Sequence, residues 1–155
     1  MTEQQKIKFK NKLKQAGIGI IQRRVDVAKA AVNDAQDGAN SEEKSSAGDK
    51  YETGRSMGHL EIDMHGRQLA EIQKELTNLQ GVEINKVHES ATIGTYIKTK
   101  NDSFFIAAGL GKQKVEDDTI FYLSPLAPLA KILIGKKVGD HFVFNEKKTI
   151  IVDLY

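Results

Sequence analysis

Cysteine and tryptophan are absent from this 155-residue chain, and aromatic residues make up only 6% of it. The lack of cysteine excludes disulfides, Cys-ligated zinc and thiol nucleophiles, and with them the acyl-transfer enzymes that need a cysteine. No apolar run approaches the ~18 residues of a transmembrane helix, and the first residues contain no hydrophobic signal core. We therefore expect a cytoplasmic protein without membrane partners. The shortage of aromatic residues favours a helical hairpin over a large globular core.

Charge is distributed unevenly along the chain, although the net charge is only +2. Basic residues predominate in residues 1–31, and acidic residues predominate in residues 34–52. The stretch from Lys6 to Lys14 is either a solvated helix face or a surface that meets nucleic acid or an acidic partner. It lacks the clustered aromatic residues that stack on RNA bases, so sequence-specific reading of RNA is not expected. Attraction of these lysines to the phosphate backbone of nascent RNA remains an alternative.

Two segments repeat apolar or small residues at alternating spacings of three and four, which is the pattern of a coiled-coil seam. The first seam contains Ile18, Ile21, Val25, Ala28, Val32 and Ala35. The second seam contains Tyr51, Arg55, Gly58, Ile62, His65, Leu69, Ile72, Leu76 and Leu79. Because a short polar connection brings neighbouring helices together, we predict an antiparallel coiled-coil hairpin over residues 1–80, with its tip at about residues 37–50.

The composition of the second seam changes along its length. Leucine and isoleucine predominate near Gly81, whereas Tyr51, Arg55 and Gly58 occupy the seam near the tip. Small and polar seam residues bury less apolar area, so we expect the tip to be thinner and less stable than the base. Gly58 is expected to permit a close approach of the two helices, and His65 is expected to be packed in the seam.

Beyond Gly81 the apolar pattern becomes that of short strands separated by turn residues. Strands are predicted at residues 82–87, 93–98, 103–108, 119–123, 141–144 and 149–154. A short amphipathic helix is predicted to begin at Pro128 and to end at Gly135. Its apolar face is expected to contain Leu129, Ile132 and Leu133. The sequence therefore predicts an α+β fold, in which a small antiparallel β-sheet domain with one short helix, residues 81–155, follows the hairpin.

Residues 128–140 read Pro-Leu-Ala-Lys-Ile-Leu-Ile-Gly-Lys-Lys-Val-Gly-Asp. This run resembles the signature Pro-Ile-Ala-Arg-Ala-Leu-Leu-Gly-Lys-Lys-Val-Gly-Asp in the C-terminal domain of the bacterial transcript-cleavage factors GreA and GreB. The resemblance implies an FKBP-like domain that docks on RNA polymerase while the hairpin enters the secondary channel and stimulates cleavage of backtracked RNA. The candidate partner-binding residues are Lys131, Lys136, Lys137 and Asp140. Prolyl isomerase activity, known from FKBP-like folds, is not expected, because Phe142 and Phe144 share one strand face and fit a core.

The resemblance also assigns a role to the acidic tip of the hairpin. In Gre factors, two tip acids help to hold a second Mg²⁺ in the polymerase active site, where it activates water against the RNA backbone. By this resemblance Glu42, Glu43 and Asp49 are the candidate catalytic residues. The Mg²⁺ would be shared with the polymerase, so the chain is expected to be an accessory rather than an enzyme, with no cofactor, metal or small-molecule substrate of its own.

The alignment of the tip keeps a second interpretation open. When the Gre tip is aligned on Tyr51, its two acidic positions fall on Lys44 and Ala47. Either the acids occupy other positions in a re-shaped loop, or the protein enters the channel without promoting cleavage. Ser, Gly, Asp and Glu also suit any exposed turn, and Asp49 fits a helix cap. The alternative function is therefore a non-catalytic Gre-like binding module that occupies the channel or binds another large assembly, such as the ribosome.

Overall fold

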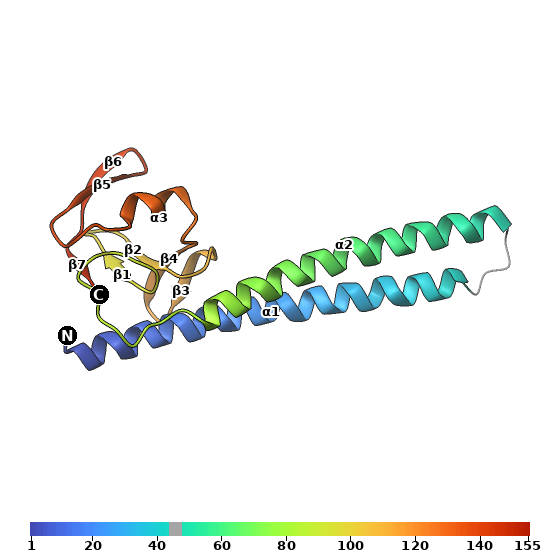
Figure 1. Ribbon diagram of the computed structural model, residues 1–155, viewed down its shortest axis with the longest axis horizontal. Helices are drawn as coiled ribbons and strands as arrows, with labels where there is room; N and C mark the ends of the chain where they lie inside the picture. The colour runs from blue at the N-terminus through green and yellow to red at the C-terminus, as the bar shows by residue number, and fades with distance from the viewer. Residues whose placement is uncertain (44–47) are drawn as a thin grey trace. The chain divides into compact units, whose positions relative to one another are not determined.

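The computed structural model describes the backbone of residues 1–43 and 48–155 and the side chains of residues 1–41 and 56–155. The chain divides into two compact units. The hairpin unit contains residues 19–77, and the β unit contains residues 1–18 and 78–155. The predicted α+β class is confirmed, since two long packed helices are followed by a mixed sheet, a two-stranded hairpin and a short helix (Figure 1).

The hairpin unit is built from parts of two long helices, α1 (Glu3–Glu43) and α2 (Gly48–Gln80). The side chains of both predicted seams are buried or half-buried wherever the structure describes them, which confirms the two seams. Gly58 allows the close approach that the sequence predicts, because a Cβ added there would lie only 2.9 Å from the Cβ of Ala39. Ala39 itself is buried and extends the first seam by four residues beyond Ala35.

The β unit contains a five-stranded sheet of order β3-β4-β2-β1-β7 and a separate β5–β6 hairpin. The strands are β1 (Tyr96–Lys98), β2 (Ser103–Ile106), β3 (Gly111–Val115), β4 (Asp118–Leu123), β5 (His141–Phe144), β6 (Lys147–Ile150) and β7 (Asp153–Leu154). One pair departs from the antiparallel expectation: β2 and β4 run parallel, with Phe104 opposite Phe121. The β3–β4 hairpin folds back on itself, so that β4 lies between β3 and β2 and runs in the direction of β2.

The strand predictions need three corrections. The predicted strand 149–154 is divided between β6, which pairs with β5, and β7, which pairs with β1. The other two corrections are a missed strand and a predicted strand that does not form. Strand β3 was missed because Lys112, Gln113 and Lys114 make it polar, as befits an edge strand that pairs only with β4. Residues 82–87 form no strand. Instead, the ammonium groups of Lys10 and Lys14 in α1 donate hydrogen bonds to backbone carbonyls of this segment. In a sheet, a neighbouring strand would satisfy these carbonyls.

The core of the β unit lies between the sheet, the helix α3 (Pro128–Leu133) and the β5–β6 hairpin. Phe104 is fully buried, and its ring packs against the rings of Phe121, Phe142 and Phe144 at centroid distances of 5.5, 6.0 and 5.1 Å. The expected core position of Phe142 and Phe144 is thus confirmed.

The predicted apolar face of α3 needs a correction. Ala130 and Leu133 are the buried residues of this helix, and Leu129 is packed at the edge of the core. Ile132 is 49% exposed. Neighbouring helical residues are separated by about 100°, so burial of Leu133 turns Ile132 toward solvent.

The first turns of α1 belong to the β unit and pack through polar contacts. Lys10 is fully buried, and its Nζ donates hydrogen bonds to the carbonyls of Lys86 at 2.6 Å and Gly94 at 3.1 Å. The Tyr122 hydroxyl donates to the Leu13 carbonyl at 2.6 Å. Part of the basic stretch is therefore packed within the fold and is not a solvated helix face.

Candidate functional site

Residues 128–140, which carry the family resemblance, form a well-defined local structure. Helix α3 begins at Pro128, and Gly135 follows it with a φ of +86°, a left-handed conformation that favours glycine. The next turn contains Gly139, with a φ of +93°. The Asp140 carboxylate closes this turn by accepting a hydrogen bond from the Lys137 backbone N–H at 2.8 Å. Both glycines of this run therefore occupy backbone positions with positive φ.

The four candidate partner-binding residues have different environments. Lys131 and Lys137 are exposed, so their ammonium groups are accessible to a partner. Lys136 is half-buried, and its backbone carbonyl accepts a hydrogen bond from Ala91. Asp140 serves the turn described above. Lys131 and Lys137 are therefore the residues of this set whose side chains are best placed to contact another molecule.

Exposed apolar side chains accompany these two lysines. Leu126 is 79% exposed, and Ile132, Ile134 and Val138 are also largely open to solvent. We call these four residues, together with Lys131 and Lys137, the α3 surface. They are close in sequence, and exposed aliphatic and basic side chains in one segment are compatible with a protein–protein contact. Sequence reasoning found the lysines but assigned Ile132 to the core.

The candidate catalytic acids lie at the described limits of the two long helices. Helix α1 ends at Glu43 and α2 begins at Gly48, so the backbone of Glu42, Glu43 and Asp49 belongs to the helices. Their side chains lie outside the described residues, as does the segment 44–47. Convergence of these carboxylates on a metal stays a prediction. Among the side chains that the structure describes, no group of three His, Asp or Glu residues is placed to hold a metal ion.

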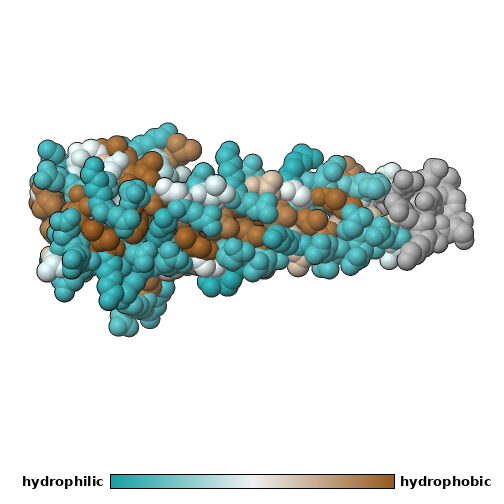
Figure 2. All heavy atoms as spheres, turned by 60° about the horizontal axis from the view of Figure 1, so that its bottom comes forward, coloured by the Kyte–Doolittle hydropathy of each residue, from teal (hydrophilic) through white to brown (hydrophobic). Residues whose placement is uncertain are grey.

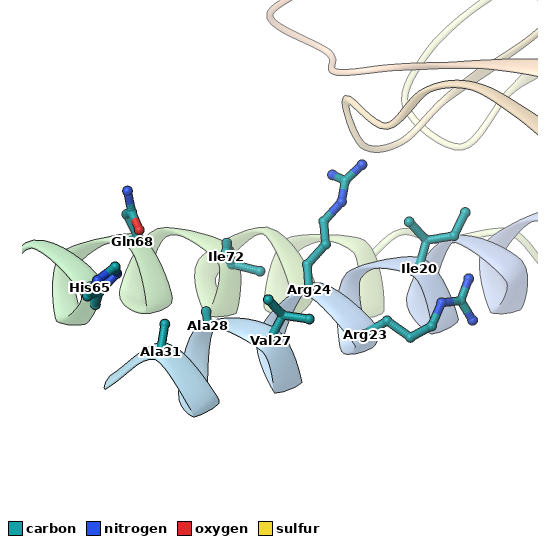
Figure 3. A pocket seen from close by; sticks show the side chains of 9 residues that line it. All are labelled: Ile20, Arg23, Arg24, Val27, Ala28, Ala31, His65, Gln68 and Ile72. Carbon is teal, nitrogen blue, oxygen red and sulfur yellow. The ribbon is translucent and has the colours of Figure 1, made fainter. Parts of the chain in front are cut away.

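A groove on the side of the hairpin unit was not found from the sequence. Its volume is about 540 Å³ (Figure 3). Helix α1 contributes Ile20, Arg23, Arg24, Val27, Ala28 and Ala31, and α2 contributes His65, Gln68 and Ile72. Figure 2 shows that hydrophobic side chains remain visible between hydrophilic ones along the paired helices. The sequence signal that could have revealed the groove is the presence of Ile20 and Val27, two aliphatic residues outside the first seam.

A buried lysine and a half-buried histidine lie near each other in the β unit. Burial lowers the pKa of Lys10 to about 8, and the nearby Glu83 carboxylate partly opposes this shift. Burial, together with the charges of Lys10 and Lys86, also lowers the pKa of His88. Within the described part of the chain, the buried Nε2 of His88 has no hydrogen-bond partner. Of the two, Lys10 holds the 82–94 segment against α1 through its hydrogen bonds to the carbonyls of Lys86 and Gly94.

No known protein-family model matches the chain, and no curated protein matches it. None of the helices in the described residues combines the length and the hydropathy that crossing a membrane requires. What the structure establishes is an architecture, a helical hairpin and a small β-sheet domain joined by α1 and α2.

Proposed function

We propose that this chain is a Gre-like transcription elongation factor that docks on RNA polymerase and inserts its helical hairpin into the secondary channel. The observation that carries the proposal is the combination of the hairpin with the segment 128–140. In this segment, the helix, the two glycine positions and the Asp140 turn give each part of the signature a defined structural role. A helical hairpin alone would be too common to suggest a function.

The α3 surface supplies the docking contact in this proposal. Its aliphatic side chains would be removed from water by a partner, and Lys131 and Lys137 would meet acidic residues at the rim of the contact. Side chains that a partner removes completely from water contribute most to affinity, whereas exposed charges at the rim mainly set the rate and orientation of binding. Docking should therefore depend more on Ile132 than on either lysine.

The hairpin supplies the inserting element. Helix α1 has 41 residues, which correspond to about 60 Å at 1.5 Å per residue. Its seam contains Ala35 and Ala39 toward the tip, opposite Gly58 in α2. Small seam residues bring the two helix axes close together, which suits a narrow passage.

The tip acids would act on the polymerase active site. Carboxylate oxygens are hard ligands that suit Mg²⁺, so Glu42, Glu43 and Asp49 fit the metal by donor type. The metal would be shared with the polymerase and would activate water for hydrolysis of the RNA backbone. In this arrangement the chain itself only positions carboxylates, and all bond-breaking takes place on the polymerase.

The first experiment measures binding to core RNA polymerase from the same organism, followed by cleavage of backtracked transcripts in the presence of Mg²⁺. Glu43→Gln and Asp49→Asn keep side-chain size and remove charge. We expect these variants to bind normally and to lose stimulated cleavage. Glu75→Gln makes the same change at an exposed position of α2 far from the tip in sequence, and it is a matched control that should retain both properties. Absence of binding at micromolar concentrations would remove the proposal.

A second candidate function is a non-catalytic module that occupies the channel or binds another large assembly, such as the ribosome. It is favoured by Lys44 and Ala47, which occupy the positions of the two Gre acids in the alignment on Tyr51. Affinity capture with the intact chain, followed by identification of the retained complex, separates the two candidates. Binding to polymerase without any shortening of the backtracked transcript supports the non-catalytic form, and retention of ribosomes alone supports a different assembly.

A further inference from the structure

The hairpin groove has the dimensions of a site for one short helix. Its α1 wall runs from Ile20 to Ala31, a distance of about 17 Å, or three helical turns, at 1.5 Å per residue. Ile72 and the 71% exposed Val27 lie between its two ends (Figure 3). A helix that packs in such a groove presents anchors at i, i+3 or i+4, and i+7. The apolar middle of the groove therefore matches two or three anchors of a partner helix.

The apolar surface continues beyond the groove along α2. Met57, Leu60 and Met64 are all exposed, and their spacing of three and four places them on one face of the helix. Gln68, which lines the groove, follows Met64 by four residues and lies on the same face. None of these four positions belongs to the seam that pairs with α1. Flexible methionines are common on surfaces that accept a partner helix.

The charges at the groove are of one sign. Arg23 and Arg24 lie at the end of the groove that contains Ile20, and both are exposed (Figure 3). The side chains that line the groove include no carboxylate. Two guanidinium groups beside an apolar floor complement a partner that carries carboxylates next to aliphatic anchors.

We propose that this side of the hairpin unit is a docking site for an acidic amphipathic helix of a partner protein. Aliphatic side chains of the partner helix occupy the groove between Val27 and Ile72, and carboxylates at one end of the helix pair with Arg23 and Arg24. The site is separate from the α3 surface and from the tip acids. It can therefore be tested with the isolated chain, without RNA polymerase.

The probe is a displayed library of random peptides of about 16 residues, long enough for the three turns of the groove and its borders. The full-length chain is immobilised and the enriched sequences are determined. We expect a consensus of aliphatic residues at i, i+4 and i+7 with Asp or Glu concentrated near one end. Individual peptides from the selection are then measured by fluorescence anisotropy against the chain and its variants.

Three variants test the assigned contacts. Arg23→Glu combined with Arg24→Glu should weaken binding about tenfold or more, because it replaces attraction by repulsion. Replacing the acidic residues of the peptide with lysine should restore binding to this double variant. Val27→Ser should weaken binding of both peptide forms. Arg67→Glu changes an exposed arginine of α2 that does not line the groove, and it should bind like the wild type. Circular dichroism establishes that each variant keeps its helices.

Several results would overturn the proposal. One is a selection without enrichment, and another is a consensus without acidic residues. A third is binding that the Arg23 and Arg24 reversals leave unchanged. Self-association of the chain that Val27→Ser abolishes, measured by sedimentation, would assign the groove to a second copy instead. Binding of a single-stranded RNA oligonucleotide that depends on both arginines, with no peptide binding, would assign it to nucleic acid.

Discussion

The two units of this protein are packed with side chains of different size. The core of the β unit contains four phenylalanine rings, three of them packed around Phe104, with Leu133 and Ile106 in the same core. The seam of the hairpin unit becomes small toward the tip, where Ala35, Ala39 and Gly58 replace larger residues. Both patterns exclude water, but each ring buries several times the area of an alanine methyl group.

This difference in side-chain size corresponds to two different structural results, a single defined arrangement of strands and a close approach of two helices. Large interlocking rings define one arrangement of strands and oppose local opening. Small seam residues bring two helices close together but contribute little burial for each residue, so the hairpin should open locally at a lower free energy than the β unit. A slender element of moderate stability and a rigid domain that holds a binding surface suit the two roles proposed above.

The largest effect is expected from Phe104→Ala. It removes a fully buried ring that contacts three other rings, so the free energy of unfolding of the β unit should fall by ~3–5 kcal/mol. Amide hydrogen exchange measured by mass spectrometry reports the β unit and the hairpin unit separately. Ile21→Val, a small truncation in the hairpin seam, is the counterpart and should cost ~0.5–1.5 kcal/mol. Equal losses of protection in the two variants would contradict the comparison between the units.

A pair of glycine substitutions tests the close approach within the hairpin. At Gly66 an added Cβ meets no atom within 4 Å, so Gly66→Ala should stabilise the helix by ~1 kcal/mol. At Gly58 the added Cβ lies 2.9 Å from the Cβ of Ala39, so the helices must separate. We expect Gly58→Ala to be less stable than Gly66→Ala by ~1–3 kcal/mol, measured by hydrogen exchange in α1 and α2. Two variants of equal stability would show that the helices do not meet at Gly58.

The buried Lys10 predicts a pH dependence that belongs to the β unit alone. Burial lowers the pKa of Lys10 from 10.5 to about 8. Between these values the unfolded chain binds a proton that the folded chain has released, so stability rises with pH. The stability gained from the release of the Lys10 proton is fully present above pH 10.5 and is lost as the pH falls from there through about 8.

The test compares thermal or urea unfolding of the wild type and Lys10→Met. As the pH rises from about 7.5 to 9.5, the free energy of unfolding of the wild type should increase by on the order of 1–2 kcal/mol relative to that of Lys10→Met. Lys12→Met removes an exposed lysine that forms an ion pair with Glu116 at 3.0 Å, and it should keep the pH dependence of the wild type. A Lys10→Met variant with the same pH profile as the wild type would show that Lys10 does not titrate in this range.

The parts of the fold that were predictable depend on local periodicity. Seam residues such as Val25 and Ile62 repeat with the period of a helix and need no knowledge of distant contacts. The same applies to helix α3, because Pro128 at its start and Gly135 shortly after its end mark helix boundaries by their own backbone preferences. The candidate lysines of the α3 surface followed from the same segment.

The parts that were not predictable depend on residues distant in sequence. The segment 82–87 has the pattern of a strand, but Lys10 and Lys14 of α1 satisfy its carbonyls. The sequence of residues 82–87 alone does not predict these contacts with α1. Likewise, the edge strand β3 forms because β4 is available to pair with it, and the groove exists because Ile72 lies beside Val27. Each of these features requires the tertiary arrangement.

The smallest effect on stability, and the sharpest test of function, is expected from Ile132→Ser. Ile132 is half-exposed on α3, so its replacement should change the free energy of unfolding by only ~0.5 kcal/mol. If the α3 surface docks on RNA polymerase, the same change removes an aliphatic anchor and should weaken binding about tenfold or more. Leu133→Ser, one residue further along, replaces a fully buried side chain and should destabilise the β unit instead. The measurement pairs urea unfolding with titration of core polymerase. An Ile132→Ser variant that is stable and binds like the wild type would exclude the α3 surface as the docking contact, even where the intact chain binds polymerase.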